Sequence, residues 1–249
     1  MDEQVYKDMS VVEGEHWWFV ARRQYLKRII AKFVFRERVD LELCEIGSGT
    51  GGNLPLLAEF GNVTAIEMEP YARQFIEQRG LDNVVKVAGG SLPDDIDLTA
   101  QYDGVFLLDV VEHIQDDLAA LKAVQKFIRK DGVLVTTVPA YQWLWSAHDV
   151  ANHHCRRYTL PDYRRLLENA GYQVQYASYF NSVLFPLAVV ERVSSRLKGA
   201  IDNVDTGLSI PVGVINSTLK ALFGLERLWA GILNIPFGLS MVVVATKKD

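Results

Sequence analysis

Several features that mark other classes of protein are missing from this chain of 249 residues. It has only two cysteines, Cys44 and Cys155, and their wide separation predicts neither a disulfide framework nor a paired metal-binding motif. The formal net charge of -5 disfavours a general nucleic-acid binder, so no nucleic-acid partner is expected. The N-terminal segment is acidic and lacks the apolar core of a signal peptide, which predicts a cytoplasmic protein.

Long uncharged stretches are scarce as well. The longest covers residues 171–190 and has the length of a membrane-spanning helix. However, it contains Gln173, Gln175 and Pro186, and its first half alternates between apolar and polar residues as a strand does. We therefore interpret this stretch as a strand followed by the start of a helix.

What remains is the composition of a globular protein, with 49% hydrophobic and 23% charged residues and no internal repeat. We expect strands at residues 41–46, 62–67, 84–87, 102–109, 133–138, 172–180 and 241–246. We expect helices at residues 1–38, 54–60, 70–79, 115–129 and 161–170, and a turn at Asp131-Gly132. This alternation predicts a doubly wound α/β fold with a mostly parallel sheet covered by helices on both faces.

The pattern also predicts three regions. Residues 1–38 form an N-terminal helical cap, and residues 39–180 with 240–249 form the α/β domain. Residues 181–239 are an apolar helical insertion between the last two strands, with helical pieces at 183–197 and 214–233. The insertion breaks the simple alternation, so we expect it to serve the specific task of the protein.

A glycine-rich loop follows the first expected strand. Gly47, Gly49 and Gly51 allow a tight turn and a close approach of the backbone to a ligand, and Glu67 ends the next strand, where an acid can accept hydrogen bonds from ribose hydroxyls. Together they predict a site for a nucleoside-type cofactor. Gly47, Gly49 and Gly52 also satisfy the dinucleotide fingerprint, so an NAD-dependent oxidoreductase remains an alternative.

Further motifs carry a resemblance to a known family. The segment 45–51, EIGSGTG, resembles the E/D-x-G-x-G-x-G motif of class I S-adenosylmethionine-dependent methyltransferases. In the same order, segments 67–70, 90–93, 102–114 and 131–134 resemble the later motifs of that family. The resemblance implies a seven-stranded sheet of order 3-2-1-4-5-7-6, with the last strand antiparallel. It implies S-adenosylmethionine as the cofactor, bound at the carboxyl ends of the strands.

The resemblance also implies the residues that bind the cofactor. An N-terminal helix covers the cofactor in related enzymes, and an arginine from it reaches the cofactor carboxylate, here Arg22 or Arg23. The implied cofactor-binding residues are Arg22, Arg23, Glu45, Gly47, Ser48, Gly49, Gly51, Asn53, Glu67, Met68, Ser91, Leu92, Leu108 and Asp109.

Two histidine-containing segments are candidates for the chemistry. Any of His148, His153 and His154, in the basic loop after the fifth strand, could act as a base, because the pKa of an imidazole is easily tuned. The segment from Asp109 to Glu112 and His113 is similar to one in quinone O-methyltransferases, where it is implied to bind a divalent metal. Alternatively it caps the next helix. We predict that the catalytic residues are Glu112, His113, His148, His153 and His154, and we expect no metal.

Acceptor binding is predicted from Trp17, Tyr141, Arg156, Arg157 and Tyr158. The two arginines could hold a phosphate or a carboxylate, although a solvated basic loop is the simpler interpretation. Trp17 could equally belong to the core.

The sequence therefore predicts an enzyme that methylates a small-molecule or lipid-like acceptor, and an anionic or lipid-linked acceptor is favoured. The apolar insertion could form a wall for that acceptor, touch the inner face of the membrane, or complete the core or a dimer face. A monomer and a homodimer are both compatible with the sequence. Besides an oxidoreductase, a non-catalytic cofactor-binding protein is the other alternative. The overall layout looks like that of bacterial and archaeal methyltransferases of unassigned substrate.

Overall fold

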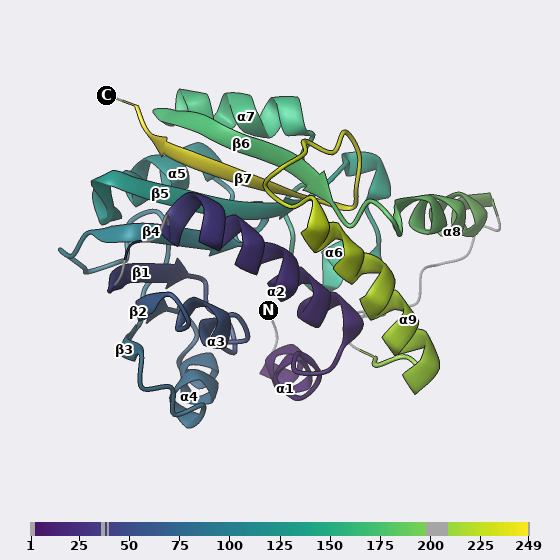
Figure 1. Cartoon of the computed structure of the whole chain (residues 1–249), viewed down its shortest axis with the longest axis horizontal. Helices are drawn as coiled ribbons and strands as arrows, with labels where there is room; N and C mark the ends of the chain where they lie inside the picture. Colours follow the sequence, from purple (N-terminus) through teal and green to yellow (C-terminus); the bar gives the residue numbers. More distant parts are fainter. Residues whose placement is uncertain (1–2, 36–37, 39, 198–208, 249) are drawn as a thin grey trace.

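One seven-stranded sheet runs through the molecule (Figure 1). The computed structural model describes residues 3–35, 38, 40–197 and 209–248. The strands are β1 (Leu41–Ile46), β2 (Gly61–Ile66), β3 (Val84–Ala88), β4 (Tyr102–Leu108), β5 (Ile128–Pro139), β6 (Tyr172–Phe180) and β7 (Ser240–Lys247). Their order is β3-β2-β1-β4-β5-β7-β6, as predicted.

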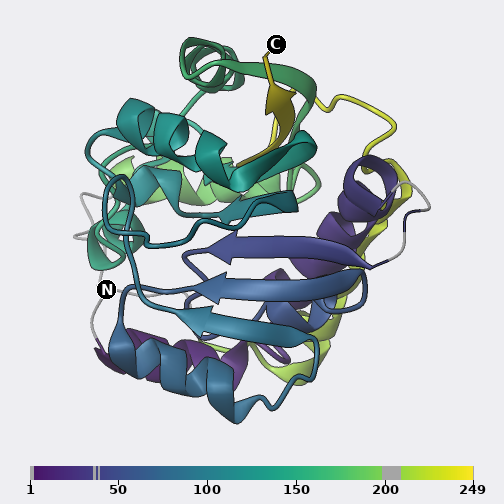
Figure 2. The ribbon, with the colours of Figure 1, turned by 90° about the vertical axis from the view of Figure 1, so that its left-hand side faces the viewer.

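The sheet is parallel except for β7, which pairs antiparallel with both β5 and β6. The arrows of β1, β2 and β3 point the same way in Figure 2, and the β1–β4 pair is parallel too. The carboxyl ends of these strands therefore meet at one edge, where the order reverses between β1 and β4. Open α/β sheets bind ligands at such an edge.

Helices cover both faces of the sheet. They are α1 (Glu3–Val12), α2 (Trp17–Ile29), α3 (Leu54–Leu57), α4 (Pro70–Gln78), α5 (Asp117–Val124), α6 (Ala147–Ala151), α7 (Leu160–Asn169), α8 (Phe185–Leu197) and α9 (Gly213–Gly224). Alternate side chains of a strand point to opposite faces of the sheet and belong to two separate cores. Leu41 and Leu43 of β1 belong to the core under α2, α3 and α9, and Cys44 and Ile46 belong to the core under α5 and α7.

The region around the fifth strand departs from the prediction. The expected helix at 115–129 ends at Val124, a short 3-10 turn follows, and β5 begins already at Ile128. The expected turn at Asp131-Gly132 was wrong, because both residues lie within β5. The β4–β5 register is irregular there, and a Cβ on Gly132 would lie 2.7 Å from the Tyr102 carbonyl oxygen. Residues 129–132 lie between the Tyr102–Ile128 and Gly104–Val133 pairs, so Asp131 and Gly132 belong to an irregular segment within β5 instead of a turn before it.

The N-terminal cap and the insertion pack on each other. The cap is two helices, and α2 continues as a π-helical turn over Ile30–Phe35. The side chain of Asn216 on α9 accepts a hydrogen bond from the Trp17 N–H (2.8 Å) and donates one to the Glu15 carbonyl oxygen (3.0 Å). The second helical piece ends at Gly224, earlier than predicted, and a 3-10 turn spans Leu225–Leu228. No helix in the described part of the chain is long and apolar enough to cross a membrane.

Candidate active site

The glycine loop links β1 to α3 and leaves its backbone bare. Gly47 and Gly49 have φ angles of +78° and +56°, a region that L side chains rarely adopt. A Cβ on Gly47 would also lie 2.6 Å from a methyl group of Val110. Glycine is therefore required at Gly47 for both conformation and space, which supports the local prediction of a tight turn.

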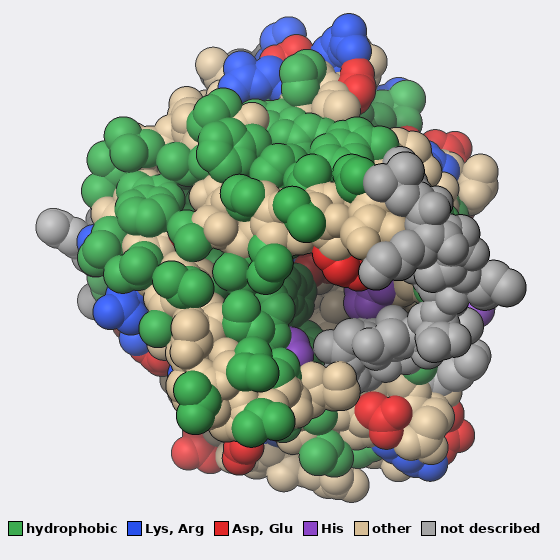
Figure 3. Space-filling model, turned by 90° about the vertical axis from the view of Figure 1, so that its right-hand side faces the viewer, with side chains coloured by type: hydrophobic (Ala, Val, Ile, Leu, Met, Phe, Trp, Pro, Cys, Tyr) green, Lys and Arg blue, Asp and Glu red, His purple; other side chains and the backbone are tan. Residues whose placement is uncertain are grey.

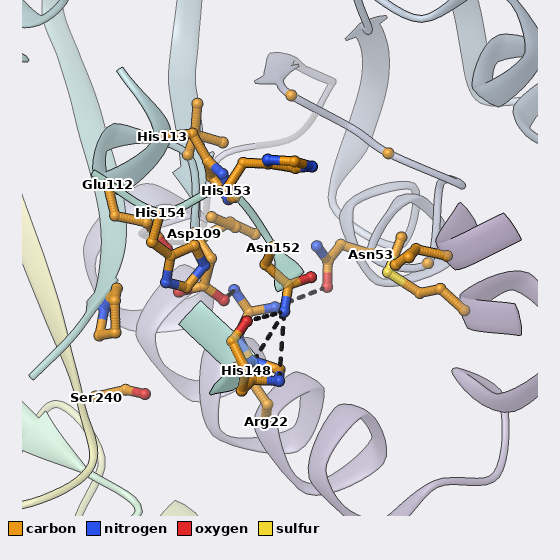
Figure 4. Close-up of a pocket in the computed structure, with 18 of the residues that line it drawn as sticks. Arg22, Asn53, Asp109, Glu112, His113, His148, Asn152, His153, His154 and Ser240 are labelled. Atoms are coloured by element: carbon orange, nitrogen blue, oxygen red, sulfur yellow. Dashed lines mark hydrogen bonds and ion pairs between the residues drawn. The ribbon is translucent and has the colours of Figure 1, made fainter. Parts of the chain in front are cut away.

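A large cavity of about 1070 Å³ begins at this loop. It runs past Glu67 and Asp109 to His113, in the turn after β4, and to His148 and His154, in the loop after β5. Helices α1 and α2 form one wall and α8 forms another. Figure 4 shows how Arg22 and Asn53 on one side approach Asp109 and the histidines on the other. The cavity thus spans both segments that the sequence predicted to be functional.

The structure places most of the predicted site residues on this cavity. All five residues predicted to be catalytic line it, and so do Trp17 and Arg157. The predicted cofactor-binding residues that line it are Arg22, Arg23, Gly47, Ser48, Gly49, Asn53, Glu67, Met68, Ser91, Leu92, Leu108 and Asp109. Glu45, Gly51, Tyr141, Arg156 and Tyr158 are not among the lining residues.

Glu67 lies just beyond β2, where it braces the glycine loop. Its carboxylate accepts hydrogen bonds from the Gly49 N–H (2.7 Å) and the Glu69 N–H (3.0 Å). Burial raises the pKa of Glu67 and these backbone hydrogen bonds oppose the rise. Each carboxylate oxygen keeps a second lone pair, so two further donors can be accepted from a ligand in the cavity.

Arg22 is buried and fixed on Asp109. Its Nη2 lies 2.7 Å from Asp109 Oδ2 and donates to the Thr137 hydroxyl at 2.9 Å. Its guanidinium also lies 5.0 Å from the ring centre of Trp18. The predicted role of Arg22 toward a cofactor carboxylate therefore has a competitor inside the protein. The neighbouring Arg23 donates to the Glu13 carbonyl oxygen at the end of α1 (2.6 Å).

Glu45 lies behind the loop and is completely buried. One carboxyl oxygen accepts a hydrogen bond from Asn53 (2.9 Å), and the other has no hydrogen-bond partner. Burial raises the pKa of Glu45 to about 7, against the opposing effects of Asn53 and Arg22. Glu45 therefore acts on the cavity through Asn53, which does line it.

The raised pKa of Glu45 predicts a pH-dependent effect of Glu45→Gln on stability. Between the usual pKa of 4.5 and about 7, the folded protein keeps this proton while the unfolded chain loses it, so wild-type stability falls as pH rises through that window. The gap corresponds to up to about 3 kcal/mol. We expect the variant to be more stable than wild type at pH 8 by up to this amount, and similar at pH 5.

Urea unfolding at both pH values tests this expectation. Glu77→Gln, at an exposed position on α4, is the matched control and should leave stability within ~0.5 kcal/mol of wild type. An equal effect of Glu45→Gln at pH 5 and pH 8 would contradict the assignment of a raised pKa.

At the far end of the cavity, Asp149 organises the histidine loop. It is completely buried and accepts hydrogen bonds from His154 Nδ1 (2.9 Å) and from Arg157 Nε and Nη2 (2.7 and 2.8 Å). Burial alone would raise the pKa of Asp149, but hydrogen bonds from His154 and Arg157 hold it well below its usual range. Asp149 is thus an anion with a fixed orientation, and it commits the Nδ1 atom of His154 to one partner. Asp149 was not among the site residues predicted from the sequence, although Ser146-x-x-Asp149 has the pattern of a capping box.

Glu112 and His113 face His154 in the cavity. The Glu112 carboxyl is completely buried and neither oxygen has a hydrogen-bond partner, so burial and the nearby charge of Asp109 raise its pKa well above the usual value. Burial lowers the pKa of His113 to about 4, and His154 adds to this shift. One donor atom from each of the three side chains lies within 4.8 Å of the others, so a proton or a cation could be shared among them.

This grouping differs from the set of Asp109, Glu112 and His113 considered from the sequence. Asp109 is paired with Arg22, so His154 takes the third place beside Glu112 and His113. The thiol of Cys155 approaches the His113 carbonyl oxygen (3.4 Å) and belongs to no donor cluster among the described residues.

Three predicted acceptor-binding residues instead support the wall of the cavity. Arg156 is paired with Asp117 (2.7 Å), and the Tyr158 hydroxyl donates to the same carboxylate (2.8 Å). The Tyr141 ring stacks on Tyr179 at 5.1 Å between centroids. Each of these side chains thus contacts another part of the protein and is not among the residues that line the cavity, and their role in acceptor binding stays a prediction.

Comparison with known proteins decides the family. The model of a methyltransferase-domain family matches residues 19–177. The chain belongs to this methyltransferase family. Membership rules in favour of an enzyme and against the oxidoreductase alternative. No curated protein matches the chain.

Solved structures share the fold of this methyltransferase at low sequence identity. A Haloferax volcanii chain in complex with the Trm112 methyltransferase activator has a TM-score of 0.58 at 16% identity, over 99% of this chain and 95% of that one. An S-adenosylmethionine-dependent methyltransferase from Clostridium acetobutylicum has a TM-score of 0.56 at 12% identity, over 91% and 92% of the two chains. Phosphoethanolamine N-methyltransferase 2 of Haemonchus contortus, solved with S-adenosylmethionine, has a TM-score of 0.57 at 15% identity, over 90% and 52%.

Proposed function

We propose that this methyltransferase transfers a methyl group from S-adenosylmethionine to a small-molecule or lipid-like acceptor. The observation that carries the proposal is that a single cavity joins the glycine loop and Glu67 to His113 and His154. Methyl transfer from a sulfonium is an in-line displacement, which requires donor and acceptor to be aligned and shielded from water. A cavity with a cofactor end and an acceptor end meets this requirement.

The residues at the cofactor end fit S-adenosylmethionine. The bare backbone at Gly47 and Gly49 permits close approach of the ligand, and the Glu67 carboxylate can accept hydrogen bonds from two ribose hydroxyls. Met68 and Leu92 supply apolar surface for the adenine ring. When bound, the cofactor supplies an electrophilic methyl group on its sulfonium.

At the acceptor end we assign the role of base to His154. Because its Nδ1 donates to the buried Asp149, its Nε2 is the atom left to accept a proton from an acceptor hydroxyl or amine. The Asp149 carboxylate would stabilise the imidazolium that forms. The acceptor atom then gains the methyl group, and His154 gains the proton of the acceptor. Water later takes this proton from His154.

The lipid-like acceptor fits the cavity better than an anionic one. Arg156 and Arg157 were the predicted anion ligands, but Asp117 neutralises the first and Asp149 binds the second through two hydrogen bonds. An anionic acceptor would have to compete with these carboxylates. We therefore propose a lipid-like acceptor that carries no negative charge.

Transfer of radiolabel tests the acceptor class and the base together. Wild-type enzyme is incubated with methyl-labelled S-adenosylmethionine and either a total lipid extract or an aqueous extract of bacterial cells. We expect label in the lipid extract, and a loss of roughly a hundredfold in rate for His154→Ala, because a missing general base typically costs this much or more. Asp149→Asn should lower the rate as well.

The control is His148→Ala, since His148 lines the same cavity and the hydrogen bond to Asp149 comes from His154. It should retain most of the activity. Label confined to water-soluble products would overturn the lipid-like acceptor, and full activity of His154→Ala would overturn the base.

A further inference from the structure

The insertion exposes an extended apolar face. The term apolar face is used here for the large hydrophobic residues of the insertion that are between 38% and 77% exposed. They are Val183, Leu187, Val190, Val193, Ile210, Val212, Val214, Ile215, Leu222, Leu225, Leu228, Ile232, Leu233 and Phe237. In Figure 3, which views the side on which α8 and α9 lie, hydrophobic side chains cover much of the surface and border one side of a hollow in which histidines are visible, with an acidic side chain at its rim. Exposed apolar patches this extensive mark interaction sites.

Helix α8 connects this face to the active-site cavity. Ala188, Glu191 and Arg192 line the cavity from one side of the helix. Val190 and Val193 lie toward the opposite side by helical spacing, and both are well exposed. One helix therefore separates the acceptor end of the cavity from the apolar face, so whatever covers that face borders the entrance for the acceptor.

The charges of this region fit a lipid surface. The protein has 31 Asp and Glu residues, yet residues 209–239 include only one, Glu226, and it is completely buried. The other charged residues of that stretch are cationic: Arg227 is exposed and Lys220 is half-buried. Residues 209–239 thus present apolar and cationic groups without an exposed carboxylate, whereas Glu191 of α8 is exposed beside Val190. The part of the face formed by residues 209–239 is complementary to hydrocarbon bounded by lipid phosphates.

We propose that the apolar face rests on a lipid bilayer, from which the enzyme takes its acceptor. This inference rests on the lipid-like acceptor of the proposed function. A second copy of the chain or a partner protein on this face would cover the entrance to the cavity. A bilayer instead presents the acceptor to that entrance, and apolar burial supplies the binding free energy.

Co-sedimentation with phosphatidylcholine vesicles tests the proposal without knowledge of the acceptor. We expect wild-type protein to sediment with the vesicles, and Val190→Asp to weaken partition by about tenfold or more, because a carboxylate at this place must be desolvated. Ile232→Asp provides a second variant from a different part of the face. Val85→Asp on the edge strand β3 is the matched control, since it makes the same substitution at a similar exposure (56%, against 67% for Val190).

Each outcome has a defined meaning. Loss of vesicle binding in both variants of the face, with Val85→Asp unchanged, supports the proposal. Wild-type protein that stays in the supernatant overturns it, and so does equal weakening by Val85→Asp. Light scattering that shows a dimer broken by Val190→Asp, without vesicle binding, would assign the face to self-association instead. Titration with S-adenosylhomocysteine separates the membrane contact from the proposed methyl transfer. Binding of S-adenosylhomocysteine without binding to vesicles refutes only the membrane contact. Binding to vesicles without binding of S-adenosylhomocysteine refutes the proposed function.

Discussion

Replacing Glu67 by alanine should weaken the binding of S-adenosylmethionine and S-adenosylhomocysteine by a few hundredfold, while wild-type protein binds both. The carboxylate can accept hydrogen bonds from two ribose hydroxyls, and each bond to a charged acceptor contributes roughly 1.5–3 kcal/mol. At the lower end of this range, losing both costs about 3–4 kcal/mol, which corresponds to a factor of several hundred. Isothermal titration of purified protein measures the change directly.

The neighbouring Glu69→Ala is the control for charge. Glu69 is two residues away and is not among the residues that line the cavity, so its removal should change the affinity by less than about threefold. Because Glu67 also holds the Gly49 N–H, a thermal melt of each variant must show that the fold persists. Unchanged binding by Glu67→Ala, or binding of NAD in place of S-adenosylmethionine, would refute the proposed cofactor site.

Replacing Glu226 by alanine should destabilise the protein by about 3–5 kcal/mol, because a buried acceptor of several hydrogen bonds is removed. Glu226 is completely buried and accepts backbone N–H bonds from Asn181 (2.8 Å), Ser182 (2.6 Å) and Val183 (2.9 Å). In the variant, three backbone donors between β6 and α8 would lose their partner. Urea unfolding measures the difference.

Two further variants define the cause. Glu226→Gln keeps one acceptor oxygen and should lose about half as much stability. Arg227→Ala, at the next and exposed position, should cost less than about 0.5 kcal/mol. A loss below about 1 kcal/mol for Glu226→Ala would mean that the bonds around residues 181–183 do not hold the insertion in place.

The two variants probe opposite ends of the same cavity. Glu67 acts at the cofactor end, whereas Glu226 fixes the loop from which Asn181 reaches the cavity and from which α8 begins. We therefore expect Glu226→Ala, at temperatures where it stays folded, to bind S-adenosylhomocysteine normally.

Sequence reasoning succeeded where a property depends on neighbouring residues. The glycines of the loop, the acid that follows β2 and the alternation in the first half of residues 171–190 are local signals, since allowed φ angles and side-chain periodicity are set within a few residues. It failed around Ile128 and Asp131, where β5 begins at the Tyr102–Ile128 pair and continues through an irregular segment, against local preferences for a helix and a turn.

The sequence by itself determined the fold class, the strand order implied by the family motifs, and the place of the cofactor loop. Only the tertiary structure decided which charged groups remain available in the cavity. Arg156 meets Asp117, Arg22 meets Asp109, and Asp149 selects His154 among three neighbouring histidines. These pairs join residues from separate elements, and a buried charge requires a partner that local sequence does not reveal.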